Sequence, residues 1–236
     1  MSRDEEYLVW KNWENDQFCQ CSKFEAATYR AEIKKTGLNS IQNVVEIGFG
    51  NGGLLAYSKM QNWDVIGVEL NDELVSRARA KGIAALPFHE FSSIENEWAD
   101  LIVAIDVFEH IEQKNLEELL TQIRIKLKPG GVLLARFPNA DSPFGLVNQN
   151  GDFTHATALG SYKVEYLAKN FGFEISYIGG ESYPVFCGHF KYGIQRAISN
   201  PIRYFLEKIT HAVFFPTNPF IKFFSINTVI ALKKAG

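Results

Sequence analysis

Short apolar runs alternate with amphipathic stretches along the first third of the chain. The run at 44–47 ends in glycines and is followed by good helix formers at 54–60, and the run at 65–69 is followed by a second helical pattern at 72–81. Each pair predicts a strand followed by a helix. Two such units in succession predict parallel strands, because the intervening helix carries the chain back to the start of the sheet.

The same alternation continues toward the C-terminus. The run at 101–105 is apolar throughout, as a central strand covered by helices on both faces should be. A Lys-Pro-Gly-Gly tetrapeptide at 128–131 ends a helical pattern and predicts a turn before the fifth strand. The remaining patterns predict, in order, a weak strand, a helix, the fifth strand, another helix and two final strands, at 83–86, 115–127, 132–137, 161–170, 173–178 and 225–232.

Two segments fall outside this alternation. Residues 138–160 are rich in Asn, Asp, Gly and Pro, and so long a connection without periodicity is typical of a functional loop. Residues 183–224 are rich in Phe and Tyr, carry five basic residues against one acidic residue, and show helical apolar spacing that breaks at Pro201. Such a segment could cover an acceptor pocket, form a dimer face or lie on a membrane surface. We expect it to pack onto the core as a lid.

The composition is that of one large domain. With 236 residues, of which 46% are hydrophobic, the chain can bury a full core without help from disulfides or metals. We therefore expect a single domain over 1–236. Its parts are an N-terminal helical cap, a core, the aromatic and basic insertion and the last strand, at 1–40, 41–182, 183–224 and 225–236.

Charge and composition also exclude several classes of function. The net charge of −3 supplies no global attraction for nucleic acid, so no nucleic-acid partner is expected. Three cysteines without an evident pairing fit a reducing compartment, and no apolar stretch of about 20 residues is present to span a membrane. These features predict a soluble, cytoplasmic protein. No group of His, Cys and Asp residues has metal-ligand spacing, so no metal site is predicted.

A glycine-rich turn follows the first strand, in the segment 46–53. Glycines there let the backbone approach a ligand closely at the carboxyl edge of a parallel sheet, where such folds bind ligands. Gly48, Gly50 and Gly53 satisfy the dinucleotide pattern GxGxxG. The turn alone therefore leaves open a nicotinamide site, or a tight turn that only packs a helix on a strand.

The surrounding residues favour another cofactor. Glu46, Gly48, Gly50 and Gly52 form the pattern acidic-x-Gly-x-Gly-x-Gly, an acidic residue ends the second strand and another ends the fourth, and the Lys-Pro-Gly-Gly turn precedes the fifth. Over roughly 40–180 the chain resembles the class I S-adenosylmethionine (SAM)-dependent methyltransferases. The resemblance implies an α/β, Rossmann-like, seven-stranded and mostly parallel sheet in the order 3-2-1-4-5-7-6. It also implies an antiparallel last strand and helices on both faces.

The resemblance also implies the cofactor, SAM, its product, S-adenosylhomocysteine, and the residues that bind them. Glu69 would accept the two ribose hydroxyls, and Glu46 would hold the glycine loop and the cationic methionine portion. Backbone carbonyls near Asp106 would receive the methionine ammonium, while Glu109 and His110 would fix that loop. The full predicted cofactor set is Glu46, Gly48, Phe49, Gly50, Gly52, Glu69, Leu70, Glu90, Phe91, Asp106 and Val107.

Methyl transfer from a sulfonium needs alignment more than acid–base chemistry, because the thioether leaves without being protonated. A hydroxyl acceptor is nevertheless a poor nucleophile while it keeps its proton, so it requires a general base, most simply a histidine. His155 in the 138–160 loop is our candidate base, with Asp152 near enough to orient it. The alternative is a loop histidine that makes an ordinary hydrogen bond.

Several acceptors remain open at this point. Residues 136–148 and 151–155 resemble methyltransferases of bacterial cell-surface polysaccharide and O-antigen synthesis, which implies O-methylation of a saccharide or another small hydroxylated molecule. The core also resembles ubiquinone and menaquinone methyltransferases, which implies a quinone, lipid or amine acceptor. A third interpretation is a scaffold without catalysis that binds a partner through 183–224. A homodimer contact or peripheral membrane contact through that segment is also open.

Overall fold

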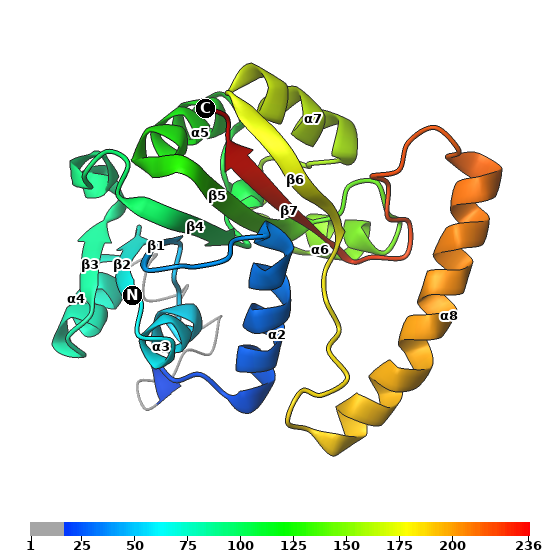
Figure 1. Ribbon diagram of the computed structural model, residues 1–236, viewed down its shortest axis with the longest axis horizontal. Coiled ribbons are helices and arrows are strands. Elements are labelled where there is room, and N and C mark those ends of the chain that lie inside the picture. The colour runs from blue at the N-terminus through cyan, green and yellow to red at the C-terminus, as the bar shows by residue number, and fades with distance from the viewer. Residues whose placement is uncertain (1–16) are drawn as a thin grey trace.

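The protein is described by a computed structural model, in which residues 17–236 are placed. A seven-stranded sheet forms its centre, in the order β3-β2-β1-β4-β5-β7-β6 (Figure 1). Strand β7 runs antiparallel to both of its neighbours, β5 and β6. The other neighbouring pairs, β3–β2, β2–β1, β1–β4 and β4–β5, are parallel. The predicted strand order and the antiparallel last strand are confirmed. The strands are β1 Asn43–Ile47, β2 Asp64–Glu69, β3 Ala84–Pro87, β4 Ala99–Ile105, β5 Leu127–Pro138, β6 Phe173–Gly180 and β7 Asn227–Lys234.

Helices cover both faces of this sheet, as predicted. Side chains of α2, α3 and α4 join one buried cluster, and side chains of α5 and α7 join the other. Successive side chains of a strand point to opposite faces of the sheet, so the central strands contribute to both clusters. Val44 and Val103 belong to the cluster with α2, α3 and α4, and Val45 and Ile102 belong to the cluster with α5 and α7. The helices are α2 Lys23–Ile33, α3 Gly53–Met60, α4 Asp72–Ala80, α5 Gln113–Lys126, α6 Gly145–Gly151, α7 Ser161–Asn170 and α8 Phe190–Phe214, with short 3-10 helices η2 Lys34–Thr36, η3 Phe88–Ser93 and η4 Phe108–His110.

The predicted turn at 128–131 lies inside β5 instead of before it. Ala99 pairs with Leu127 and Leu101 pairs with Val132, so the tetrapeptide bulges out of the ladder between two paired positions. Gly130 has a φ of 78°, a left-handed backbone conformation that glycine adopts without the strain of a residue with a Cβ. The bulge aligns the end of β5 with the end of β4, where the candidate site lies.

Outside the sheet, the helices of the N-terminal cap, the 138–160 loop and the 183–224 insertion agree only in part with those predicted from the sequence. Residues 1–16 of the predicted N-terminal cap lie outside the described residues, whereas α2 forms as expected and begins with a capping box between Ser22 and Glu25. The segment 138–160 contains α6, which its composition did not predict. Between β6 and β7, the insertion forms one continuous 25-residue helix, α8, in which Pro201 does not break the helical path.

Helix α8 does not lie on the core as the expected lid. In Figure 1 it stands beside the sheet, and Gly193 is its one buried residue. Among residues 17–236, no helix combines the length and the apolar character that a bilayer span requires. The large apolar side chains of α8 are exposed.

Candidate functional site

A cavity of about 1090 Å³ opens at the carboxyl ends of β1, β2 and β4. Parallel sheets of this kind bind ligands at that edge. All of the predicted cofactor residues line the cavity except Gly52 and Glu90. The fold therefore brings to one place side chains that the sequence spreads over some sixty residues.

The glycine loop between β1 and α3 is built from left-handed backbone. Gly48, Gly50 and Gly52 have φ values of 69°, 50° and 75°, which residues with a Cβ rarely adopt. A Cβ on Gly48 would lie 2.5 Å from Cγ2 of Val107, and one on Gly52 would lie 2.5 Å from Sγ of Cys19. Gly52 thus packs the loop against the N-terminal segment instead of facing the cavity.

Gly48→Ala is expected to destabilise the protein by about 2–4 kcal/mol, because left-handed backbone strain of about 1–3 kcal/mol adds to the overlap with Val107. Urea unfolding measures the change. Gly82→Ala is the matched control, since Gly82 has a φ of 71° with nothing within 4 Å of an added Cβ, and so reports the backbone strain alone. Equal losses in the two variants would show that Gly48 is not closely packed.

Glu69, at the end of β2, braces the glycine loop. Its carboxylate accepts hydrogen bonds from the backbone N–H groups of Gly50, at 3.0 Å, of Leu70, at 2.8 Å, and of Asn71, at 3.3 Å. A carboxylate offers about four lone-pair sites, so these bonds leave acceptor capacity on a side chain that lines the cavity. The residue can therefore hold the loop and receive ligand hydroxyls at once.

Glu46 is a buried carboxylate in the same cavity wall, with 5% of its surface exposed. Burial raises the pKa of its carboxyl well above the usual range, and the negative charge of Glu69 raises it further. Within residues 17–236, its Oε2 atom has no hydrogen-bond partner. A buried acceptor of this kind is costly unless a donor or a cation satisfies it. A ligand with a cationic group or a hydrogen-bond donor at this place would satisfy it.

Asp106 follows β4 in a left-handed conformation, with a φ of 55°. Its carboxylate forms a two-point ion pair with the guanidinium of Arg136 from β5. Burial alone would lower the pKa of Arg136, but the charge of Asp106 outweighs it and raises that pKa. The ion pair neutralises the Asp106 carboxylate, and the turn at Asp106 and Val107 lines the cavity.

The predicted cofactor residues Glu90 and Phe91 lie in the short helix η3. Phe91 is 4% exposed and stands in the cavity wall, together with Phe88, His89 and Ser92. Glu90, which was also predicted to bind the cofactor, lies outside the lining, with its carboxylate 3.8 Å from Nε2 of His89. With three residues per turn, successive side chains of η3 point in different directions, and Glu90 is the residue of 88–92 that stays out of the lining.

Helix α2 adds residues to the wall that the cofactor motifs did not include. Glu25 and Tyr29 both line the cavity. Burial raises the pKa of the Tyr29 hydroxyl, and the charge of Glu46 adds to the effect. Tyr29 therefore keeps its proton and is a hydrogen-bond donor on the cavity wall.

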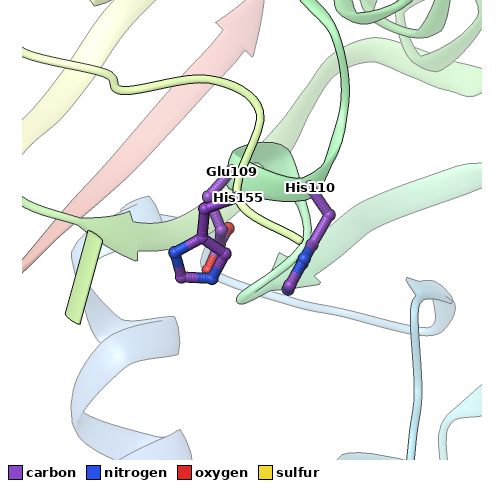
Figure 2. A group of neighbouring side chains, drawn as sticks. All are labelled: Glu109, His110 and His155. Atoms are coloured by element: carbon purple, nitrogen blue, oxygen red, sulfur yellow. The ribbon is translucent and has the colours of Figure 1, made fainter. Parts of the chain in front are cut away.

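A second, smaller cavity of about 310 Å³ adjoins the first, and Asp106 and His110 line both. His155 and Asp152 line only the smaller cavity, so the two predicted catalytic residues lie next to the cofactor cavity and not within it. Figure 2 shows His155 beside Glu109 and His110, and the centroids of the two imidazole rings are 4.7 Å apart.

Backbone hydrogen bonds bring this cluster together. The carbonyl of Glu109 accepts from the N–H groups of Ala156, at 2.7 Å, and of Thr157, at 3.0 Å, which docks the loop onto η4. These bonds involve the backbone carbonyl of Glu109 and the loop at 152–157, whereas the sequence predicted that Glu109 fixes the loop after β4. No spacing in the sequence shows this group, because 45 residues separate His110 from His155.

The hydrogen bonds of His155 differ from those expected. Its Nδ1 atom lies 3.2 Å from the carbonyl oxygen of Gln149, so the main chain and not Asp152 orients the ring. Asp152 lies at 4.0 Å from Nε2. Burial alone would raise the pKa of Asp152, but hydrogen bonds from Thr154 outweigh it and lower that pKa. Asp152 therefore supplies negative charge near Nε2 of His155.

A family described as "Methyltransferase domain" matches residues 13–192. The chain belongs to this methyltransferase family. Its cofactor is S-adenosylmethionine, in agreement with the resemblance of the glycine turn. A nicotinamide enzyme is therefore not the correct interpretation of the overlapping glycine pattern.

Among curated proteins, the cyclopropane-fatty-acyl-phospholipid synthase of Escherichia coli strain K12 is 27% identical over 130 residues. The match covers 53% of this chain and 32% of that protein, so the chain spans about a third of the length of this relative. The match supports relatedness of the core and leaves the acceptor open.

Solved structures repeat the fold. A SAM-dependent methyltransferase from Archaeoglobus fulgidus superposes with a TM-score of 0.67 at 18% identity, covering 97% of this chain and 99% of that one. Phosphoethanolamine N-methyltransferase 2 of Haemonchus contortus, in complex with SAM, gives a TM-score of 0.61 at 16% identity, covering 100% of this chain and 61% of that one. At these identities the likeness concerns the fold.

Proposed function

We propose that this protein transfers the methyl group of SAM to a hydroxyl oxygen of a saccharide or another small hydroxylated acceptor. The observation that carries the proposal is the position of the histidine and carboxylate cluster. It lines a second cavity that meets the cofactor cavity at Asp106 and His110. An acceptor in the smaller cavity would present its hydroxyl between His155 and the cofactor.

When bound, SAM supplies a methyl group on a positively charged sulfur. Glu69 and Glu46 would hold the ribose and the cationic methionine portion, and the strained turn at Asp106 would offer backbone carbonyls to the ammonium. These contacts align the methyl group with the acceptor, which is the main requirement of an in-line displacement.

His155 would act as the base. A carbonyl oxygen can only accept a hydrogen bond, so the contact with Gln149 places the imidazole hydrogen on Nδ1 and leaves the lone pair on Nε2. Nε2 takes the acceptor proton, the acceptor oxygen bonds to the methyl carbon, and the carbon–sulfur bond breaks with its electron pair on sulfur. Asp152 would stabilise the imidazolium that results.

The proposal is tested by incubating the protein with methyl-labelled SAM and a panel of glycans, phenols, quinols, lipids and amines. Labelled methyl ether on a hydroxyl acceptor supports the proposal. Labelled amine or carbon product in its place supports the alternative acceptors on the same core. Absence of both SAM and S-adenosylhomocysteine binding in calorimetry would support the scaffold interpretation instead.

The outward face of α8 favours an acceptor that is presented at a membrane surface. One face of the helix, which we call the inner stripe, consists of polar residues that contact the body of the protein. Arg196 donates to the carbonyl of Pro184, and Glu207 accepts from the N–H groups of Phe223 and Phe224. The inner stripe is Arg196, Asn200, Arg203, Glu207 and His211.

The opposite face of α8, the outer stripe, is apolar and exposed. Its members recur at intervals of three or four residues, and Ile198 and Phe205 have exposed fractions of 62% and 64%. The usual arrangement is the reverse, with apolar residues toward the protein. Residues 183–224 also carry a net charge of +4 in a chain of −3. The outer stripe is Ile194, Ile198, Ile202, Phe205 and Ile209.

An anionic membrane surface fits both properties of α8, because lipids can bury the outer stripe while their headgroups attract the exposed Lys191 and Lys208. The curated relative is named for a phospholipid product, which is compatible with an acceptor held in a membrane. We therefore propose that α8 docks the protein on anionic lipid, with the hydroxyl acceptor carried on a lipid.

Ile198→Asp combined with Phe205→Asp is expected to weaken sedimentation with phosphatidylglycerol-containing vesicles by roughly 100-fold. Each buried apolar side chain contributes roughly 1.5 kcal/mol or more, which corresponds to about tenfold in affinity. Met60→Asp is the matched control, because Met60 is exposed on α3 away from α8. Absence of wild-type binding, or a dimer that the double variant dissociates in sedimentation velocity, would contradict membrane docking.

A further inference from the structure

We propose that Glu109, His110 and His155 form a binding site for a divalent transition-metal cation such as Zn²⁺. Each residue offers one ligand atom, and these atoms all lie within 4.8 Å of one another. Figure 2 shows the three side chains converging from η4 and from the loop that carries His155. No metal site was predicted from the sequence, because the ligands come from segments far apart in the chain.

The spacing suits a small cation. Bonds from Zn²⁺ to histidine nitrogen and carboxylate oxygen measure about 2.0–2.2 Å, which places two ligand atoms of a tetrahedral site about 3.4 Å apart. Side-chain rotations that bring atoms now within 4.8 Å of one another closer by at most about 1.4 Å therefore suffice. The backbone needs no rearrangement, because the bonds from Ala156 and Thr157 to the Glu109 carbonyl already hold the two segments together.

The hydrogen bonds around His155 prepare it to bind a metal. Its Nδ1–H group donates to the carbonyl of Gln149, so its Nε2 atom carries the lone pair. Metal-ligating histidines nearly always donate their other ring N–H to a carbonyl, a carboxylate or another fixed acceptor, which sets the tautomer and the ring orientation. His155 has this arrangement.

His110 has the same arrangement through a relay. The hydroxyl of Thr154 donates its single hydrogen to Oδ1 of Asp152, at 2.6 Å. The Thr154 oxygen also lies 2.8 Å from Nδ1 of His110, and it can act there only as an acceptor. The His110 hydrogen is consequently on Nδ1, and Nε2 is the nitrogen able to bind a cation. Two histidines fixed in the same tautomer by separate partners distinguish this cluster from a chance grouping.

The donor set defines the class of metal. Two imidazole nitrogens and one carboxylate oxygen favour Zn²⁺ and neighbouring transition metals over Mg²⁺ or Ca²⁺, which prefer oxygen ligands. Three protein ligands leave a fourth position, and all three residues line the smaller cavity, where an acceptor would enter. This is the ligand count of a catalytic metal site and not of a structural one.

The role of the cation in catalysis rests on the proposed function, whereas the metal site itself rests only on the positions of the three side chains. A cation in this position would lower the pKa of an acceptor hydroxyl bound at the fourth position. The hydroxyl proton would pass to solvent water, and the oxygen would then attack the methyl carbon as described above. His155 would in that case act as a metal ligand, and the cation would replace its Nε2 atom as the activating group.

The test is calorimetric titration of chelator-treated protein with ZnCl₂, without SAM or acceptor. One equivalent of Zn²⁺ is expected to bind the wild type, and His155→Ala is expected to lose that binding. Thr154→Val is expected to weaken it about 10–100-fold by removing the partner of His110, and Thr154→Ser is expected to restore it. His189→Ala, which changes an exposed histidine next to α8, is expected to bind as the wild type does.

The outcomes separate this proposal from the proposed function. Equal Zn²⁺ binding by the wild type and His155→Ala, or binding that only thiol alkylation removes, would overturn the site. Unchanged S-adenosylhomocysteine affinity in each variant shows that the variant is folded. Methyl transfer to a hydroxyl that persists in the chelator-treated protein would overturn the cation's role while leaving the proposed function intact. Zn²⁺ binding with these variant effects, but without methyl transfer, would support the site and overturn the function.

Discussion

His155→Ala is expected to lower kcat for a hydroxyl acceptor by about 10²–10⁴-fold, the usual contribution of a positioned group that removes a proton. The affinity for S-adenosylhomocysteine is expected to stay unchanged, because His155 lines the smaller cavity and not the cofactor cavity. Initial rates with methyl-labelled SAM and calorimetric titration of the product measure the two quantities on the same preparation.

Two comparisons make this result specific. His189→Ala is the matched control, since it removes an exposed histidine far from both cavities along the chain. An acceptor with a more acidic hydroxyl, such as a phenol, is expected to suffer a smaller loss than an alcohol, because it needs less help to lose its proton. Full turnover of an alcohol by His155→Ala would refute the role of this residue in deprotonation.

The sheet could be predicted because its determinants are local. Each strand of the core is a short apolar run, each following helix has its own apolar spacing, and parallel pairing follows from their alternation. The glycine turn and Glu69 could be placed for the same reason, since the ends of β1 and β2 fix them directly. The bulge at 128–131 was missed because it depends on the register with β4, which local sequence does not encode.

The cluster of Glu109, His110 and His155 depends on tertiary contacts. It forms because two N–H groups of the 152–157 loop bind the backbone carbonyl of Glu109, and backbone bonds of this kind leave no side-chain pattern to read. The inward direction of Phe91 and the outward direction of Glu90 likewise depend on how η3 sits on the cavity wall, where Phe91 is buried and Glu90 is outside the lining. Sequence reasoning found the segment and assigned one residue too many to the cavity.

Helix α8 shows a different limit of pattern reading. The apolar spacing predicted a helix, and the helix is present, but the usual assumption that its apolar face turns inward fails here. Fixed polar contacts of Arg196, Asn200 and Glu207 with the body set its rotation instead. An apolar stripe in the sequence identifies a helix face that favours burial. Only the structure shows whether that face packs on the same chain or stays exposed for another partner.

Glu69→Ala is expected to weaken binding of S-adenosylhomocysteine by at least about 100-fold. A charge-assisted hydrogen bond contributes about 1.5–3 kcal/mol, and we expect two from this carboxylate to the ribose hydroxyls. The substitution also removes the acceptor for the Gly50 N–H, which loosens the glycine loop that the cofactor contacts. Calorimetric titration with S-adenosylhomocysteine measures the loss directly.

The chain offers a closely matched control for this prediction. Glu73 lies in the first turn of α4, four residues after Glu69, and its carboxylate pairs with Arg77 away from the cavity lining. Glu73→Ala removes the same charge from the same region, so cofactor affinity is expected to change less than twofold. Equal losses in the two variants would assign the effect to local charge and not to contacts with the ribose. A Glu69→Gln variant with intermediate affinity would identify the carboxylate charge as the larger part of the interaction, because an amide can accept a hydrogen bond without carrying that charge.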